Sequence, residues 1–136
     1  MTVFTFPYVE ERTREGLPIF RPSALIYLRG ADGLWKPFRV YADAGADVTL
    51  LTITDCYWLG YEWEAGRLQL MGGICSGLIR TFVHLIPLRL GTEEFLCSIA
   101  FAERVDVPSL LGRSEVFKRF KVCYDDVERV TKFILR

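Results

Sequence analysis

The sequence predicts an all-β fold whose short strands close into a barrel. Short β-rich runs recur along the chain, turn signals rich in glycine and aspartate separate them, and one convincing helical segment stands near the C-terminus. The chain has 136 residues, 51% of them hydrophobic, which is enough to fill one core. We expect residues 1–136 to form a single domain. Residues 1–21, ahead of Pro22, could be an N-terminal arm, an autoprocessing region or a loose terminus.

The first half of the chain predicts a hairpin followed by a third strand. Residues 24–28 are a short apolar run that ends in the turn signal at 29–33, and residues 35–42 follow as the second strand. Side chains that alternate along this second strand would place one set in the core and the other in solvent. Residues 48–53 are a further β-rich run, and residues 55–60 are either a short helix or irregular.

The second half predicts the remaining strands and the helix. We expect strands at residues 67–71, 77–83, 82–90, 94–101, 109–112, 121–124 and 130–135. Residues 114–120 predict a short C-terminal helix, because Ser114 can cap the first turn. Glu115 near the start, and Lys118 and Arg119 near the end, suit the helix dipole.

Charge and hydropathy exclude two classes of partner. The formal net charge is zero and basic residues form no stripe, so we expect no nucleic-acid partner. The sequence contains no uninterrupted apolar run of about 18 residues and no signal peptide at its start. We therefore expect no membrane partner and a cytoplasmic location.

The cysteines and the one histidine do not match a metal site. Cys56, Cys75, Cys97 and Cys123 contain no C-x-x-C pair, and His84 is the sole histidine of the chain. We predict buried, reduced thiols, as is usual in a reducing cytoplasm. No metal and no cofactor is expected.

The segment with the strongest chemical signal is residues 40–51. A strand leads to Asp43, the small residues Ala44, Gly45 and Ala46 form a turn, and a β-rich run resumes after Asp47. Small residues allow another backbone to approach closely, and glycine adopts dihedral angles that are closed to other residues. An aspartate in this position would sit at a loop tip on a rigid base.

Three segments, in order, resemble the retropepsins, the dimeric aspartic peptidases of retroviruses and their cellular relatives. The run Asp43-Ala44-Gly45-Ala46, followed by Asp47-Val48-Thr49, is similar to their Asp-Thr/Ser-Gly-Ala active-site loop. The second segment resembles their glycine-rich flap hairpin and comprises Met71, Gly72, Gly73, Ile74, Cys75, Ser76, Gly77, Leu78 and Ile79. The third resembles their apolar-apolar-Gly motif before the C-terminal helix and comprises Leu110, Leu111, Gly112 and Arg113.

The resemblance implies a homodimeric aspartic endopeptidase with a closed barrel and a flap. This chain offers one aspartate in such a loop, so a second copy would supply the other carboxylate at a two-fold axis. The expected partner is a polypeptide substrate, bound in apolar pockets lined by Val48, Ile74, Leu78 and Ile79. The terminal strand at 130–135 would contribute to an intersubunit sheet, as in the family.

Two positions near the loop need separate interpretation. Ala44 departs from the family, whose Thr or Ser hydroxyl ties the two loops together across the dimer. Asp47 is interpreted as structural, with Arg113 as a candidate ion-pair partner. Asp32, beside Gly33, is interpreted as a hairpin-turn residue rather than a second catalytic aspartate.

Two alternatives remain open. The same fold could serve as a dimeric peptide-binding or scaffolding module with little or no turnover, which the missing hydroxyl at Ala44 favours. An unrelated β-barrel ligand carrier would be a monomer with Asp43 on an ordinary surface turn.

Overall fold

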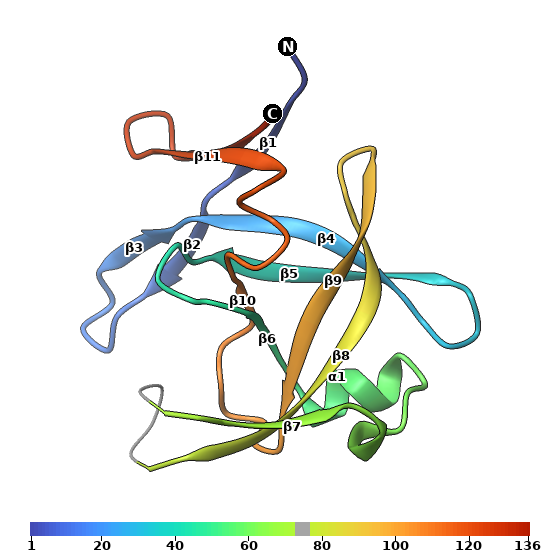
Figure 1. The fold of residues 1–136 in the computed structure, drawn as a ribbon. Coiled ribbons are helices and arrows are strands. Elements are labelled where there is room, and N and C mark those ends of the chain that lie inside the picture. The colour runs from blue at the N-terminus through green and yellow to red at the C-terminus, as the bar shows by residue number, and fades with distance from the viewer. Residues whose placement is uncertain (73–76) are drawn as a thin grey trace.

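Seven strands of the protein form one sheet that closes on itself (Figure 1). The computed structural model describes residues 1–72 and 77–136. In sheet order the strands are β4 (Ser23–Arg29), β5 (Trp35–Ala42), β10 (Leu110–Leu111), β6 (Thr49–Thr52), β9 (Glu93–Ala102), β8 (Ile79–Leu90) and β7 (Arg67–Met71). A further pairing of β4 with β8 closes the ring and leaves β7 outside it. The predicted all-β class is confirmed.

The two ends of the described chain meet in a second, three-stranded sheet. It consists of β1 (Val3–Pro7), β12 (Val130–Leu135) and β11 (Phe120–Asp125), with β12 in the middle. A separate hairpin of β2 (Val9–Arg12) and β3 (Pro18–Arg21) follows β1. In Figure 1 the N- and C-terminal ends accordingly lie beside each other. Residues 1–21 therefore contain three paired strands, β1, β2 and β3.

Aromatic packing joins the three-stranded sheet to the ring. Phe120 and Phe133 are fully buried, and their rings meet edge to face at 5.9 Å between centroids. Phe4 of β1 packs on Phe120, with ring centroids 6.2 Å apart. The Phe4 ring also covers Gly91 in the β8–β9 turn, where an added Cβ would lie 2.2 Å from a ring carbon. Burial of each such aromatic side chain contributes about 1.5–3 kcal/mol to folding.

The α-helix of the described residues is α1 (Ile53–Trp58), and Thr52 and Asp55 form a capping box at its start. It overlaps residues 55–60, for which a short helix is one of the two expectations. A short 3-10 turn, η1 (Trp63–Ala65), follows. Neither helix has the length and apolar character needed to cross a membrane, and the rest of the described chain contains no such helix.

The predicted helix at residues 114–120 is wrong. Residues 114–119 form successive turns, and Glu115 has a positive φ of 64°, which an α-helix cannot accommodate. The Glu115 carboxylate accepts a hydrogen bond of 2.6 Å from the backbone N–H of Ser98 in β9. This long-range contact, with the left-handed backbone, accounts for the break in the local helix pattern.

The strands expected at 77–83 and 82–90 are one continuous strand, β8. It pairs with β9 without interruption from Thr81 to Leu90. Its first part also pairs with β7, and its last part pairs with β4. β8 therefore links the hairpin at the open end of the sheet to the closure of the ring.

Candidate functional site

Asp43 follows directly on the last residue of β5 and begins a tight loop. Its side chain is half-buried, whereas Ala44 and Gly45 are exposed. The carboxylate oxygen Oδ1 accepts a hydrogen bond of 2.8 Å from the backbone N–H of Gly45. The backbone N–H of Ala46 donates to the carbonyl oxygen of Asp43 at 3.2 Å, which closes the turn. The carboxylate is thereby held at the loop tip by its own backbone.

The segment after β10 holds this loop from one side. The backbone N–H of Asp43 donates to the carbonyl of Leu111 at 3.1 Å. The N–H groups of Arg113 and Ser114 donate to the carbonyls of Ala46 and Asp47, each at 2.9 Å. Two of the segments singled out in the sequence, 43–47 and 110–113, are thus joined by backbone hydrogen bonds.

Gly112 permits the closest of these approaches. A Cβ atom at this position would lie 2.4 Å from the carbonyl carbon of Val48 and 2.9 Å from the backbone nitrogen of Thr49. Its N–H donates to the buried hydroxyl of Thr49 at 3.1 Å. The position therefore requires glycine because two backbones touch there.

The expected ion pair between Asp47 and Arg113 is not formed. Among the described residues, no oxygen of Asp47 lies within 4.0 Å of a guanidinium nitrogen of Arg113. Both side chains are exposed and line a cavity of about 540 Å³. The two residues are linked through the backbone contacts just described rather than through their charges.

Asp43 itself lines two further cavities. The first, of about 610 Å³, separates the Asp43 loop from β7. Besides Asp43 it is lined by Gly45, Ala46, Asp47, Val48, Leu50, Arg67, Gln69, Leu70, Met71, Gly72, Val83, Ser98, Leu110 and Ser114. The second, of about 540 Å³, is lined by Glu11, Arg21, Pro22, Tyr41, Ala42, Asp43, Pro108 and Leu110. A chain in extended conformation could reach Asp43 from either side.

The second cavity has a polar wall that comes from the N-terminal hairpin. Glu11 accepts hydrogen bonds from the Tyr41 hydroxyl and, at 2.6 Å, from Nε of Arg21. The hydrogen bond from Tyr41 is the main reason why the pKa of Glu11 lies below its usual value, and Arg21 adds to the effect. The same bond raises the pKa of Tyr41. No sequence pattern links these residues, because β2, β3 and β5 meet only in the folded chain.

The hairpin expected to act as a flap is formed by β7 and β8. Met71 and Ile79 are its last paired residues, and Gly77 has a positive φ of 89°. Leu78 is 71% exposed, whereas Ile79 is 3% exposed and packs in a cluster with Leu50 and Val107. Ile79 therefore supports the hairpin from beneath, and the expectation that it faces a substrate is not met. Gly73, Ile74, Cys75 and Ser76 lie outside the described residues.

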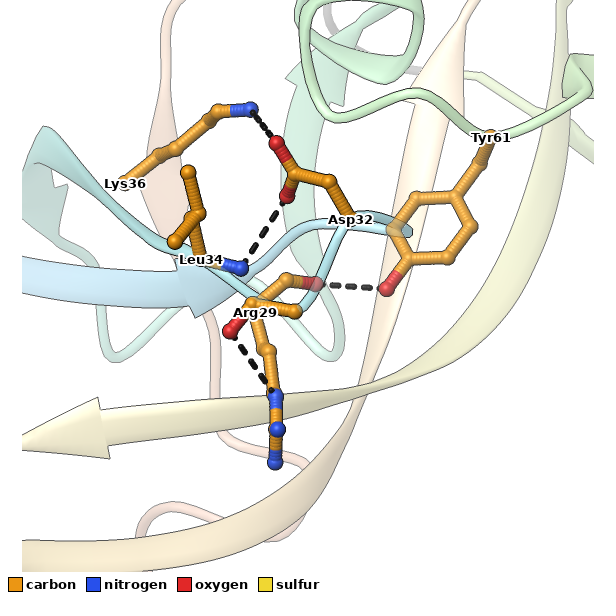
Figure 2. Close-up of polar contacts among 6 residues, drawn as sticks. Arg29, Asp32, Leu34, Lys36 and Tyr61 are labelled. Atoms are coloured by element: carbon orange, nitrogen blue, oxygen red, sulfur yellow. Dashed lines mark hydrogen bonds and ion pairs between the residues drawn. The ribbon is translucent and has the colours of Figure 1, made fainter.

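Asp32 is a turn residue, as predicted (Figure 2). Its carboxylate accepts a hydrogen bond of 3.0 Å from the backbone N–H of Leu34 and forms an ion pair of 3.3 Å with Lys36. The bond from Leu34 is the main reason why the pKa of Asp32 is lowered. The Tyr61 hydroxyl donates a hydrogen bond to the backbone carbonyl of Arg29, at the start of the same turn. Asp32 is thus engaged in the β4–β5 turn.

The described cysteines are free thiols, and two of them are buried. Residues 1–72 and 77–136 contain no group of three or more His, Cys, Asp and Glu side chains that could hold a metal ion. Cys56, Cys97 and Cys123 are free thiols. Burial raises the pKa of Cys56 to about 11 and that of Cys97 to about 12, so both stay protonated at neutral pH.

The chain is similar in sequence to a curated protein over part of its length. No family model matches it. A stretch of 85 residues is 29% identical to DNA damage-inducible protein 1 of Yarrowia lipolytica, and covers 61% of this chain and 21% of that protein. The chain therefore spans about a fifth of the length of the curated relative that it matches.

Two solved structures share the fold. A retropepsin-like aspartic protease from Rickettsia conorii is similar with a TM-score of 0.60 and 19% identity, over 97% of this chain and 92% of that chain. EIAV protease in complex with the inhibitor HBY-793 is similar with a TM-score of 0.50 and 25% identity, over 68% of this chain and 82% of that chain. The first likeness extends over nearly the whole chain, so the shared feature is the fold as a unit and not one motif.

Proposed function

We propose that this chain, whose fold is that of the retropepsin-like aspartic proteases, is one subunit of a homodimeric aspartic endopeptidase. The observation that carries the proposal is the position of Asp43. Its half-buried carboxylate is held by Gly45 at the tip of a braced loop, between two cavities that together offer room for an extended peptide. Fold and site point to the same chemistry.

Peptide hydrolysis by carboxylates requires two of them in close proximity. One carboxylate acts as general base on a water molecule, and the other, protonated, polarises the carbonyl group of the scissile bond. Two like charges a few ångströms apart resist joint ionisation, so the pair shares one proton and titrates as a unit. In the proposed dimer the Asp43 side chains of both subunits form this pair.

We propose a second subunit because the other carboxylates near Asp43, among the described residues, are engaged or exposed. Glu11, in the second cavity, is bonded to Tyr41 and Arg21. Asp32 is engaged in the β4–β5 turn with Lys36. Asp47 shares the loop with Asp43 and lines the same cavity, but its side chain is exposed and also lines the cavity beside Arg113, and we interpret it as structural. A two-fold axis beside the Asp43 loop supplies the missing group with the commonest oligomer symmetry.

We propose that the two subunits pair through β11, whose outer edge has no partner strand among the described residues. β12 has β1 on one side and β11 on the other, so it has no edge left for a partner strand. Tyr124 of β11 contacts the carbonyl of Ala42, the residue before Asp43. Pairing of two β11 edges would therefore bring the two Asp43 loops toward the same axis. The strand at residues 130–135, β12, was expected to contribute to the intersubunit sheet. In this proposal β12 instead lies behind β11 and supports the interface.

The β7–β8 hairpin is proposed to cover the bound peptide. Met71, Gly72 and Leu70 line the cavity on the side opposite Asp43. β7 is the open edge of the seven-stranded sheet, and such an edge can pair with an extended substrate. Closure over the peptide would exclude water other than the attacking molecule.

A dimeric peptide-binding module with little turnover is the second candidate, and Ala44 is the observation that favours it. Its exposed methyl group cannot form the hydroxyl hydrogen bonds that the family uses between the two loops. Loss of one such hydrogen bond costs about 0.5–1.5 kcal/mol. The two candidates share fold, dimer and cleft, and differ in whether bound peptide is cut.

The deciding experiment is cleavage of an unstructured protein substrate from acid to neutral pH, with and without a statine-type transition-state mimic. Asp43→Asn should abolish cleavage and leave the sedimentation coefficient of the dimer unchanged. Asp32→Asn is the matched control and should cleave like the wild type, because it changes an aspartate of the β4–β5 turn.

Each other outcome has a defined meaning. Cleavage by Asp43→Asn at the wild-type rate would refute the peptidase assignment. A dimer that binds the mimic but cuts nothing would support the binding module. A monomer at all concentrations would refute both candidates.

A further inference from the structure

Beyond β10 and its following residues, a second element holds the Asp43 loop. The hydroxyl of Tyr124, in β11, donates a hydrogen bond of 3.2 Å to the carbonyl oxygen of Ala42. Ala42 is the last residue of β5 and precedes Asp43 directly. The contact joins residues 82 positions apart and connects the three-stranded sheet to the base of the loop.

The charge of the Asp43 carboxylate acts on the Tyr124 phenol, whose hydroxyl is bonded to the residue before Asp43. Burial raises the pKa of Tyr124, and the negative charge of Asp43 raises it further. A hydrogen bond with the backbone of Ala44 acts in the opposite direction. The phenol therefore remains protonated at neutral pH and can donate to the carbonyl of Ala42, the residue before Asp43.

We propose that Tyr124 is a positioning residue that fixes the orientation of the Asp43 carboxylate. The chain lacks a hydroxyl at position 44, so the loop needs support from another side chain. The Tyr124 hydroxyl gives that support from β11, opposite to the side on which Leu111 and Arg113 hold the loop. With both sides held, the carboxylate keeps its orientation without reorganisation when substrate binds. This inference rests on the proposed function.

Tyr124→Phe is the direct test, because it removes the hydroxyl and keeps the ring. Tyr8→Phe is the matched control, because the Tyr8 hydroxyl donates to Asp126 at 2.8 Å and, within the described part of the chain, forms no hydrogen bond to residues 42–47. In Tyr124→Phe we expect kcat to fall about three- to tenfold, the effect of one lost hydrogen bond, with KM within about twofold of wild type. Tyr8→Phe should leave both constants unchanged.

A second measurement does not depend on turnover. Amide hydrogen exchange of Asp43 and Ala46 reports how firmly the loop is held, since both N–H groups donate within the site. Exchange at these two amides should become about three- to tenfold faster in Tyr124→Phe and stay at the wild-type rate in Tyr8→Phe. A merely structural role of Tyr124 would lower the melting temperature of Tyr124→Phe without faster exchange at these two amides.

The outcomes separate the inference from the proposed function. Unchanged exchange at Asp43 and Ala46 in Tyr124→Phe overturns the positioning role, whether or not the protein cleaves. If the wild type cleaves and Tyr124→Phe keeps its full kcat, the inference is overturned and the peptidase assignment stands. If the wild type cleaves nothing, but exchange at the loop rises in Tyr124→Phe, the peptidase assignment falls and Tyr124 remains the residue that holds the loop.

Discussion

The buried hydroxyl of Thr49 accepts a hydrogen bond from the backbone N–H of Gly112, 63 residues further along the chain. Gly112 lies between Leu111 and Arg113, whose backbone groups are bonded to Asp43 and Ala46 of the loop. Thr49→Val should therefore leave the Gly112 N–H buried without a partner and lower the free energy of unfolding by about 1–3 kcal/mol. Urea unfolding of the two proteins measures the difference.

The chain offers a matched control for that change. Thr131, in β12, is also fully buried, but its hydroxyl has no hydrogen-bond partner among the described residues. Thr131→Val should be neutral or stabilising, because it removes a buried polar group that forms no bond. Equal losses in the two variants would contradict the role assigned to the Thr49 hydroxyl.

Gly112→Ala tests the backbone contact itself. The added methyl group would meet the Val48 carbonyl at 2.4 Å, and backbone cannot move aside as a side chain can. We expect a loss of about 2–3 kcal/mol in the free energy of unfolding, as for other overpacked sites. Gly72→Ala is the comparison, since its Cβ would lie 3.6 Å from Leu78, an ordinary contact distance. A thermal melt in which both variants unfold at the same temperature would argue against the close approach.

Phe4→Ala tests whether residues 1–7 belong to the fold. The ring packs on Phe120 and covers Gly91, so its removal should cost about 2–4 kcal/mol. Val3→Ala changes a neighbouring side chain that is 40% exposed and should cost less than about 1 kcal/mol. A wild-type unfolding midpoint in Phe4→Ala would mean that β1 is dispensable.

The buried thiol of Cys97 predicts a loss of stability in alkali. Its pKa is raised from 9.0 to about 12, chiefly by burial, so the folded state holds the proton more tightly than the unfolded state does. The stabilising contribution is fully present below about pH 9 and is lost as pH rises toward about 12, by up to about 1.4 kcal/mol per pH unit. Cys97→Ala should show a shallower decline of unfolding free energy between pH 9 and 11. A decline as steep as that of the wild type would show that other groups cause it.

Ala44→Thr tests the missing hydroxyl. If two subunits meet at the Asp43 loops, one restored hydrogen bond per loop should strengthen the dimer by about 1–3 kcal/mol, or about five- to 150-fold in the dissociation constant. Sedimentation at several concentrations measures this constant. Ala65→Thr adds the same group at an exposed site of η1 and should not change it. A weaker dimer in Ala44→Thr would indicate that the loops do not meet as proposed.

Local sequence signals predicted the elements whose partners lie nearby. Residues 35–42, 67–71 and 130–135 are strands with the predicted bounds, because apolar alternation and adjacent turns define them within a few residues. The family resemblance selected the Asp43 loop and the 110–113 segment, and the structure joins them by backbone hydrogen bonds.

Long-range contacts account for the rest. At Glu115 a good local helix pattern is overridden by a hydrogen bond to Ser98 and a left-handed backbone. Glu11 and Tyr41 meet across 30 residues, and Tyr124 and Ala42 across 82, so neither pair leaves a pattern in a short window. The capping box of Thr52 and Asp55 is a local contact and not a long-range one, and it sets the start of α1.

The open edge of β7 could promote aggregation as well as bind a substrate. Closure of the ring leaves this strand with one unpaired side, and its Leu68 and Leu70 side chains are 53% and 54% exposed. An exposed edge with apolar side chains is a template for any extended chain, including an unfolded copy of the same protein. At high protein concentration, aggregation and substrate binding would therefore compete for the same backbone N–H and C=O groups of β7. A peptide that binds this edge tightly should keep the protein in solution.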